Sequence, residues 1–411
     1  MKSGWKTKTL GEVCSFLNRG ISPRYLARGG ICVPNQKCIR DHRVSYEPSR
    51  RHDARAKKVG SERLIQAGDV LVNSTGTGTL GRVAQLRENP PEPTTVDSHV
   101  TIVRPTPGQF YPEFFGYMLV VIEDAIKKAG EGCGGQTELA RSVLAKKFPV
   151  HYPELLPEQQ RIVGLLDEAF EGIATAKANA EKNLKNARAL FASHLHSVFT
   201  QRGEGWVVRR ISEIAKHSLG KMLDKAKNKG EPQPYLRNIN VRWFTFDLSD
   251  LLQMPFLPQE AAKYTAVKGD VLICEGGYPG RAAIWDGDYP IYFQKALHRV
   301  RFHEPEHNKW FVYYLFAQDK SGELKQHFSG TGIQHFTGEV LARFELPLLP
   351  LSELRRAVGR FEELSAETQR LESIYQQKLA ALDALKKSLL HRAFSGQLTR
   401  DNGELTRDKG Q

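Results

Sequence analysis

The chain repeats itself, and this internal duplication limits the possible folds more than any other feature of the sequence. Gly68-Asp69-Val70-Leu71-Val72 recurs as Gly269-Asp270-Val271-Leu272-Ile273, so that Asp69 and Asp270 are 201 positions apart. Residues 5–13 and 206–214 align at the same offset, and each segment begins with Trp. Three further matches follow in the same order: 81–84 with 280–283, 134–136 with 331–334, and 196–199 with 391–394. Matches in one order along the whole chain predict two copies of one structural unit.

Each copy begins with a part that is rich in Gly, Pro and short runs of β-forming residues. These parts cover residues 1–153 and 204–350. Apolar runs between turn residues predict strands at 70–72, 100–103, 271–273 and 291–293. Aromatic and aliphatic residues at helical spacing predict short helices over 112–128 and 308–318. Each part is therefore expected to be a mixed, β-rich globular domain.

The second part of each copy is helical. Residues 154–203 and 351–400 carry apolar residues at alternating three- and four-residue spacing, the heptad pattern of a coiled coil. The expected seams include Ile162, Leu166, Ile173 and Leu184, then Phe361, Leu371, Leu382 and Leu389. The second seam also takes in Lys378 and Leu385. Residues 401–411 form a polar tail.

The two helices most economically bury their seams against each other. Each would be ~65 Å long at 1.5 Å per residue, and a single helix with one apolar seam is rarely stable alone. Each helix could instead pack on its own domain, or the chain could form a homodimer through both. We predict an α+β fold with two mixed β-rich domains. These alternate with two long helices that pair as an antiparallel coiled coil.

The charge of the chain favours a polyanionic partner. The formal net charge is +13 and the pI is about 9.4. The five cysteines are odd in number and lack C-x-x-C spacing, which argues against zinc and disulfide frameworks and for a reducing cytoplasm. No run of about 18 apolar residues occurs, so no membrane span is expected.

Sequence motifs for catalysis are missing. There is no P-loop, no dinucleotide-binding G-x-G-x-x-G after a strand and no H-E-x-x-H zinc motif. Asn89-Pro90-Pro91-Glu92 approaches an amino-methyltransferase motif, but Glu92 cannot stack on a flipped base. Glu323 and Lys325, with Asp319, are the weak nominees for an unrecognised enzyme site. We therefore expect no catalytic residues, metal ligands or bound cofactor.

The β-rich parts offer better material for binding DNA. Basic residues gather within 19–63 and 216–243 and could neutralise phosphates. Residues 235–243 place Arg and Asn among apolar residues, and we expect a strand there whose polar face meets DNA; residues 33–37 are its counterpart. The candidate DNA contacts in the first domain are Asn35, Gln36, Lys37, Ser74, Thr75, Thr77, Arg82 and Gln136. Those in the second are Lys221, Tyr235, Arg237, Asn238, Asn240, Arg281, Gln334 and His335, with Glu275 and Tyr278 as further loop candidates.

The order of domain, helix, domain and helix resembles the specificity subunit of type I restriction–modification systems. That family has a Trp followed by a Leu/Ile-x-Glu-Ile/Val turn, and a Gly-Asp-Val/Ile-Leu strand. Both occur twice here. The family enters its helices through a Glu-Gln-x-x-Ile stretch, found here as Glu158-Gln159-Gln160-Arg161-Ile162. The second helix departs from this pattern, because Leu351-Ser352-Glu353-Leu354-Arg355 lacks the Glu-Gln.

The resemblance implies a non-catalytic subunit that reads a split double-stranded DNA sequence, one half with each domain, and holds the gap with its helices. Two methyltransferase subunits carrying S-adenosylmethionine would dock on the helices, and restriction subunits using ATP and magnesium could join them. Adenine methylation by base flipping would belong to those partners. The main alternative is a stand-alone DNA-binding regulator or architectural protein that dimerises through its coiled coil.

Overall fold

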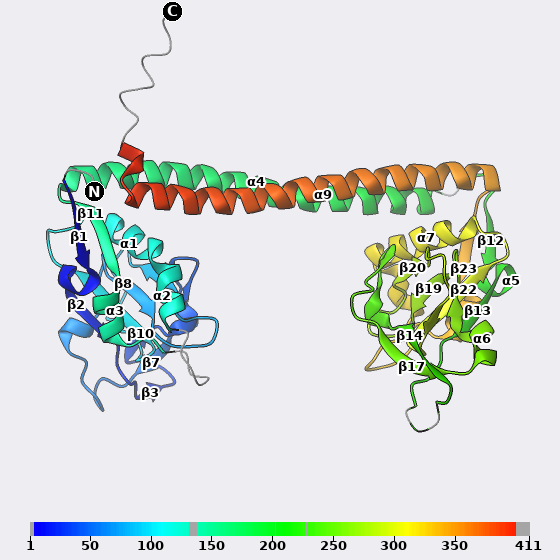
Figure 1. The fold of residues 1–411 in the computed structure, drawn as a ribbon, viewed down its shortest axis with the longest axis horizontal. Helices are drawn as coiled ribbons and strands as arrows, with labels where there is room; N and C mark the ends of the chain where they lie inside the picture. Colours follow the sequence, from blue (N-terminus) through cyan, green and yellow to red (C-terminus); the bar gives the residue numbers. More distant parts are fainter. Residues whose placement is uncertain (1–3, 131–137, 202, 225, 227, 400–411) are drawn as a thin grey trace, which may run out of the picture. The chain divides into compact units, whose positions relative to one another are not determined.

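The computed structural model describes residues 4–130, 138–201, 203–224, 226 and 228–399. The chain divides into two compact units, residues 1–179 with 378–411 and residues 180–377. Each unit contains one β-rich domain and a part of each long helix (Figure 1). The domain limits predicted from the sequence stay a prediction, because the division into units falls within the helices.

The first β-rich domain contains a four-stranded antiparallel main sheet and smaller sheets of two or three strands. Its strands are β1 (Trp5–Thr9), β2 (Cys14–Arg19), β3 (Tyr25–Leu26), β4 (Ile31–Val33), β5 (Ile39–Arg40), β6 (Arg43–Val44), β7 (Arg50–His52), β8 (Val70–Asn73), β9 (Val83–Gln85), β10 (Val100–Pro105) and β11 (Pro149–Pro153). Its helices are α1 (Pro112–Val121), α2 (Glu123–Gly130) and α3 (Arg141–Lys147), with 3-10 turns η1 (Leu10–Val13), η2 (Gln36–Cys38) and η3 (Ser61–Arg63). The main sheet has the order β2-β10-β8-β9. Val70, Leu71 and Val72 are fully buried, which explains why β8 is a continuous apolar run.

The second β-rich domain repeats this plan. Its strands are β12 (Val207–Arg210), β13 (Ala215–Leu219), β14 (Glu231–Leu236), β15 (Val241–Arg242), β16 (Thr245–Phe246), β17 (Leu252–Phe256), β18 (Thr265–Ala266), β19 (Val271–Cys274), β20 (Ala282–Ile284), β21 (Ile291–Phe293), β22 (Leu297–Phe302) and β23 (Glu345–Leu348). Its helices are α5 (Ile211–Ile214), α6 (Ala261–Tyr264), α7 (His307–Ser321) and α8 (Gly338–Arg343), with 3-10 turns η4 (Asn238–Asn240), η5 (Pro258–Glu260) and η6 (Glu323–His327). The main sheet has the order β13-β22-β19-β20, the same as in the first domain. The predicted duplication is confirmed.

The repeated Gly-Asp motif has the same structural role in both domains. The Asp69 carboxylate accepts the backbone N–H of Gln66 at 2.9 Å and binds the Arg104 guanidinium with Nε–Oδ1 at 2.7 Å. Asp270 forms the equivalent ion pair with Arg301 at 2.6 Å. Each carboxylate thus fixes the turn that enters the central strand and ties it to the neighbouring strand. This explains why the motif was visible in the sequence.

The predicted long helices are confirmed as α4 (Leu156–Thr200) and α9 (Leu351–Phe394), followed by the short turn η7 (Gln397–Thr399). Gln159 joins the start of α4 to the first domain, because its Nε2 donates to the Pro153 carbonyl at 2.9 Å and its Oε1 accepts the Tyr111 N–H at 2.8 Å. The Glu-Gln-Gln stretch therefore clips the helix to its domain.

The two helices run antiparallel and side by side (Figure 1). In the first unit, Lys386 lies 5.0 Å over the Phe170 ring, and Lys177 binds Asp383 at 2.7 Å. In the second unit, Arg188 binds Glu372 at 2.8 Å, and Phe199 lies 5.9 Å from Phe361. In these pairs the residue numbers of α9 decrease as those of α4 increase. The predicted antiparallel pair within one chain is confirmed.

The seam itself follows the prediction with one correction. Ile162, Leu166, Ile173 and Phe361 are buried, and Leu184, Leu371, Leu382 and Leu389 are half-buried. Lys378 and Leu385, by contrast, are exposed, and Leu379 and Lys386 take their places. An α-helix has 3.6 residues per turn, so a strict 3.5-residue pattern drifts round the helix over several heptads.

The corresponding hairpin tips of the two domains make different contacts. In the second unit, Phe244 at the tip of the β15–β16 hairpin packs against Phe191 of α4 and against Tyr313 and Phe316 of α7, with ring centroids 5.0 to 6.4 Å apart. The hairpin tips of both domains have positive φ, at Phe244 (67°) and at His42 (59°). The repeat therefore puts His42 where the second domain has Phe244.

In the first unit the equivalent contact is polar and open. His42 Nε2 lies 2.8 Å from a carboxylate oxygen of Glu123. Lys386 stands at the repeat position of Phe191. The side chains of His42 and Lys386 line a cleft of about 980 Å³ together with those of Tyr117 and Phe170. The hairpin tip of the second domain thus packs on α4 and α7 through aromatic rings, whereas that of the first domain makes a polar contact with α2. The first domain meets the long helices elsewhere, for example where the Phe114 ring lies 4.9 Å from that of Phe394.

Candidate nucleic-acid interface

In the second domain, three loops that are far apart in the sequence converge. They are η4, the β19–β20 loop at 275–281, and residues 329–335 before α8. Asn238 Nδ2 donates to the Gly276 carbonyl at 3.0 Å, and the Phe336 N–H donates to the Glu275 carbonyl at 2.8 Å. A Cβ on Gly276 would lie 3.2 Å from the His335 ring, so this position gives the third loop room to approach. We call these loops the second three-loop cluster.

The first domain has the equivalent arrangement among its described residues, formed by η2, the β8–β9 loop at 74–82 and Glu138–Leu139. The Leu139 N–H donates to the Ser74 carbonyl at 2.8 Å, as Phe336 does to Glu275. Asn73 Nδ2 donates to the Gln36 carbonyl at 3.0 Å, and Cys274 Sγ, at the equivalent position, lies 3.6 Å from the Asn238 carbonyl. The predicted match of 33–37 with the second domain therefore holds at the level of individual contacts.

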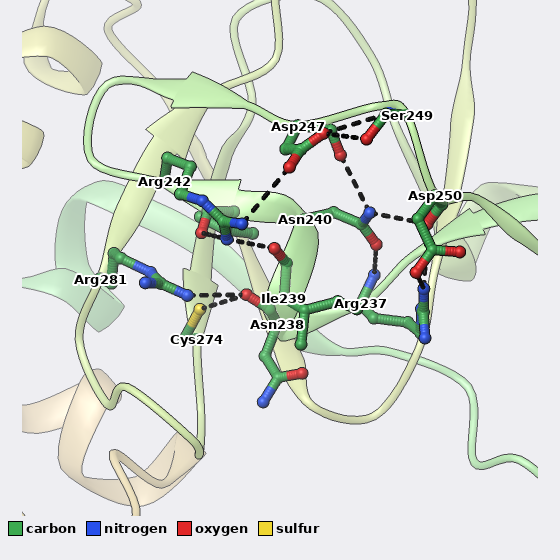
Figure 2. Close-up of polar contacts among 11 residues, drawn as sticks. Arg237, Asn238, Ile239, Asn240, Arg242, Asp247, Ser249, Asp250, Cys274 and Arg281 are labelled. Carbon is green, nitrogen blue, oxygen red and sulfur yellow. Dashed lines mark hydrogen bonds and ion pairs between the residues drawn. The ribbon is translucent and has the colours of Figure 1, made fainter. Parts of the chain in front are cut away.

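The expected strand over 235–243 is wrong. β14 ends at Leu236, and η4 turns the chain before β15 begins. Asn240 causes the turn, because its Oδ1 accepts the Arg237 N–H at 2.9 Å and its Nδ2 donates to the carbonyls of Asp247 and Asp250, both at 2.9 Å (Figure 2). Asn240 is 2% exposed. This corrects its prediction as a DNA contact: the side chain holds the loop in shape.

Three other predicted contacts are also buried. Ser74 bonds to the Thr101 hydroxyl at 2.5 Å, and Tyr235 lies in an apolar cluster with Phe256. Lys221 Nζ binds Glu260 at 2.6 Å. The structure therefore corrects the prediction for Ser74, Tyr235 and Lys221, whose side chains stabilise the domain and do not reach its surface.

Arg237 and Arg281 frame the second cluster. The Arg237 guanidinium binds Asp250 at 2.7 Å, and the Arg281 guanidinium donates to the Asn238 carbonyl at 3.0 Å (Figure 2). Arg281 also lies 4.9 Å over the ring of Tyr278, which is exposed. Both arginines are half-buried, so their first role is to fix the loop.

The candidates of the first cluster lie on one connected set of loops. Asn35 caps η2 by accepting the Lys37 N–H at 2.8 Å, and Gln36 Oε1 accepts from the Thr79 hydroxyl at 3.1 Å. The side chain of Lys37 is exposed. Lys37 is thus the candidate of η2 that is most open to a ligand.

The β8–β9 loop brings three more candidates to this cluster. Thr75 Oγ1 lies 2.7 Å from His99 Nδ1, and Arg82 donates to the Gly78 carbonyl at 3.0 Å. Thr77 is exposed at the tip of the loop. His99, which the sequence did not single out, is placed here by a contact across 24 residues.

The third loop of the second domain holds two further candidates. Gln136 lies outside the described residues. In the second domain Gln334 is exposed and His335 is half-buried, and His335 forms a backbone pair with Ser329 at 2.9 Å. Burial raises the pKa of the neighbouring Glu275 carboxyl, and His335 and Lys295 partly counteract this rise. The second cluster thus combines amide, imidazole, guanidinium and carboxyl groups.

Comparison with known proteins identifies the family. Residues 2–186 and 203–380 each match the family described as type I restriction modification DNA specificity domain. The chain belongs to this family. As a specificity subunit it directs DNA sequence recognition and is not itself an enzyme, and its partners are DNA and methyltransferase subunits. A search of curated proteins finds no match.

Solved structures share the fold of this specificity subunit. One is a chain from a study of complex assembly and conformational transition of the type I R-M system. It has a TM-score of 0.78 and 18% identity, over 97% of this chain and 99% of that one. Another is the HsdS subunit from Thermoanaerobacter tengcongensis, with a TM-score of 0.59 and 20% identity, over 97% and 98% of the two chains.

The weak nominees for an enzyme site have structural partners. Glu323 accepts from Gln318 Nε2 at 2.6 Å, and Asp319 lies 3.3 Å from the Tyr278 hydroxyl. Among the described residues no group of three potential ligands could hold a metal ion. Within the same residues, none of the helices has the length and apolar character needed to cross a membrane.

Proposed function

We propose that this specificity subunit reads a DNA target in two separated halves, one with each three-loop cluster. The observation that carries the proposal is the repetition of the cluster itself. Ser74 and Leu139 in the first domain, and Glu275 and Phe336 in the second, make the same backbone hydrogen bond at 2.8 Å. Two equivalent surfaces in one chain suit a target with two half-sequences.

The proposed readers are the candidates whose side chains are exposed or half-buried. In the first cluster they are Asn35, Gln36, Lys37, Thr75, Thr77 and Arg82, and in the second Arg237, Asn238, Arg281, Gln334 and His335. Amide and guanidinium groups can pair with base edges in the major groove. Exposed cations elsewhere, such as Arg55, Lys58, Lys216 and Lys229, would attach to phosphates in a salt-dependent manner.

Two methyltransferase subunits would dock on the helices. Leu190 of α4 and Leu385 of α9 each precede the repeated His-x-x-Phe segment by six positions, and they are 65% and 47% exposed. A single exposed leucine is ordinary, but the repeat places these two at matching positions, one in each unit. The matched pair supports two equivalent sites and hence two copies.

The cofactors would belong to the partners. The methyltransferase subunits would supply S-adenosylmethionine, and restriction subunits, where present, would use ATP and magnesium. Purified specificity subunit should neither methylate nor cut DNA when given these cofactors. Activity of the chain alone, free of contaminants, would contradict this division of labour.

Selection from a random duplex library tests the reading proposal. The specificity subunit, assembled with its methyltransferase, should enrich two short sequences separated by a gap of fixed length and free sequence. Enrichment of one continuous sequence by the chain without partners would instead support the stand-alone regulator.

Docking is tested by charge substitution of the two leucines. Leu190→Glu and Leu385→Glu should each remove one methyltransferase subunit, and the double variant should remove both. Native mass spectrometry counts the subunits. Val207→Glu is the control, because Val207 is similarly exposed, at 48%, but lies on β12 and not on a helix. Retention of both subunits by the double variant would exclude these leucines as the docking sites.

A further inference from the structure

The second three-loop cluster carries an exposed apolar residue on each of its loops. Ile239 in η4 is 45% exposed, Tyr278 in the β19–β20 loop 40%, and Ile333 in the third loop 75%. A single exposed apolar side chain needs no explanation, but three on converging loops form a candidate contact surface.

These side chains are exposed although the backbone that carries them is firmly held. The Asn238 carbonyl next to Ile239 accepts from Arg281 (Figure 2). The Asn238 side chain donates to the Gly276 carbonyl. Behind the loop, Arg237 is tied to Asp250. Several hydrogen bonds thus hold the backbone that keeps Ile239 at the surface.

The surroundings of the three residues are cationic and polar. Arg281 lies 4.9 Å over the ring of Tyr278. The exposed Lys295 and the half-buried His335 both oppose the rise in the pKa of the Glu275 carboxyl. Apolar groups set among cations suit duplex DNA, whose major groove offers the thymine 5-methyl group beside anionic phosphates.

The first domain differs at the same positions. Lys37 occupies the second position of η2, as Ile239 does in η4. Thr79 stands where the second domain has Tyr278, because its carbonyl accepts the Arg82 N–H at 3.3 Å as the Tyr278 carbonyl accepts the Arg281 N–H at 3.2 Å. Both replacements are polar. The apolar surface therefore belongs to one half of the duplication and not to the scaffold that the halves share.

We propose that Ile239 and Ile333, with Tyr278, contact thymine 5-methyl groups in the half-target that the second domain reads. The inference rests on the proposed bipartite reading and names one component of its specificity. The second half-target then contains thymine at one or more required positions, and the first half depends less on thymine methyl groups.

Replacing thymine by deoxyuridine tests this directly, because it removes only the methyl group. The sites selected by the assembled complex are resynthesised with deoxyuridine at each thymine of one half at a time. The second half is identified as the one whose preference is unchanged by Lys37→Ala with Thr77→Ala. Each contacted methyl should be worth about fourfold in affinity, the effect of burying one methyl-sized group.

The isoleucines are tested in the same assay. Ile239→Ser with Ile333→Ser should bind thymine and deoxyuridine sites equally, whereas Val207→Ser, an exposed apolar position on β12, should keep the preference of the parent. Both isoleucines are exposed, so the double variant should fold, and its circular dichroism checks this.

Three results would overturn the inference while leaving bipartite reading intact: a second half-target without thymine, equal binding of thymine and deoxyuridine by the parent, or loss of a methyltransferase subunit in the isoleucine variant. Failure of the parent complex to select any bipartite sequence would instead overturn the proposed function on which the inference rests.

Discussion

Arg104 and Asp69 form a two-pronged ion pair in the first domain, with Nε–Oδ1 at 2.7 Å and Nη2–Oδ2 at 2.8 Å. The Asp69 side chain has no exposed surface and that of Arg104 has 16%. The guanidinium also donates to the Leu64 carbonyl at 2.7 Å. One arginine therefore fixes both the strand entry and the preceding loop.

Removing this arginine should destabilise the first domain markedly. Arg104→Ala leaves the Asp69 carboxylate buried without its cation, at a cost of about 3 kcal/mol. Arg301→Ala, the matched change in the second domain, should cost less, because the Arg301 side chain is 44% exposed and water can replace it. Hydrogen exchange of the β8 and β19 amides measures the two effects separately. A larger loss in β19 than in β8 would contradict this explanation.

The two hairpin tips should differ in how much they stabilise the chain. Phe244→Ala removes half-buried aromatic packing against three rings and should cost about 2 kcal/mol. His42→Ala, at the equivalent position, should cost less than about 1 kcal/mol, since His42 and Glu123 form a partly solvated pair. Urea unfolding followed by hydrogen exchange in α7 and α1 compares the two variants. Equal losses of unfolding free energy in the two variants would show that the aromatic contacts add no more stability than the polar pair.

Acid should weaken the second domain through His298. Burial lowers the pKa of this histidine from 6.5 to about 4, with a smaller contribution from His217. Below about pH 6.5, His298 therefore binds a proton in the unfolded chain but stays neutral in the folded domain. The free energy of unfolding thus falls as the pH drops from about 6.5 to 4. The loss between pH 7 and pH 5 should be about 2 kcal/mol.

Tryptophan fluorescence can follow this effect. Trp206, Trp243, Trp285 and Trp310 all belong to the second unit, and Trp5 is the fifth tryptophan of the chain. Urea unfolding at both pH values is compared for the parent and His298→Leu, which keeps an apolar side chain in the site. A variant with an undiminished pH dependence would show that another group is responsible.

Much of the fold was predictable because it rests on local chemistry. The Gly-Asp turn and the apolar runs of β8 and β19 each depend on residues close together in the sequence. The helix pair was predictable for the same reason, since one seam of heptad spacing needs a partner. The error at Lys378 and Leu385 arose from the drift between heptad and helical periods, which accumulates with length.

The site was less predictable because it depends on distant contacts. Asn240 looked like a reader of bases, since its burial depends on Asp247 and Asp250, which the alternating pattern over 235–243 concealed. The convergence of Asn238, Gly276 and His335 joins positions almost 100 residues apart. Sequence can name the residue types that suit DNA, but the tertiary fold decides which of them remain exposed.

The helix pair should set the gap between the two half-targets. Lys177 pairs with Asp383, and Arg188 pairs with Glu372, so eleven residues forward in α4 match eleven backward in α9. Seven-residue insertions after Lys177 and after Leu382, beside the Lys177–Asp383 pair, thus extend both helices at one level and keep both seams in phase.

The insertion lengthens the pair by ~10 Å, or about three base pairs at 3.4 Å each. The lengthened specificity subunit, assembled with its methyltransferase, should keep both half-sequences and select a wider gap. The control is an insertion in α4 alone, which puts the seams out of phase and should abolish specific binding. An unchanged gap with specific binding would mean that the helices are not the spacer.

The most direct test of the central claim, that each three-loop cluster reads one half of the target, is library selection with variants confined to one cluster. Lys37→Ala with Thr77→Ala changes the first cluster, and Tyr278→Ala with Gln334→Ala changes the second; all four side chains are exposed. Each double variant, assembled with its methyltransferase, should lose its preference in one half-sequence only, and the two variants should affect opposite halves. Changes in both halves with either variant, or in neither half with both, would contradict the claim.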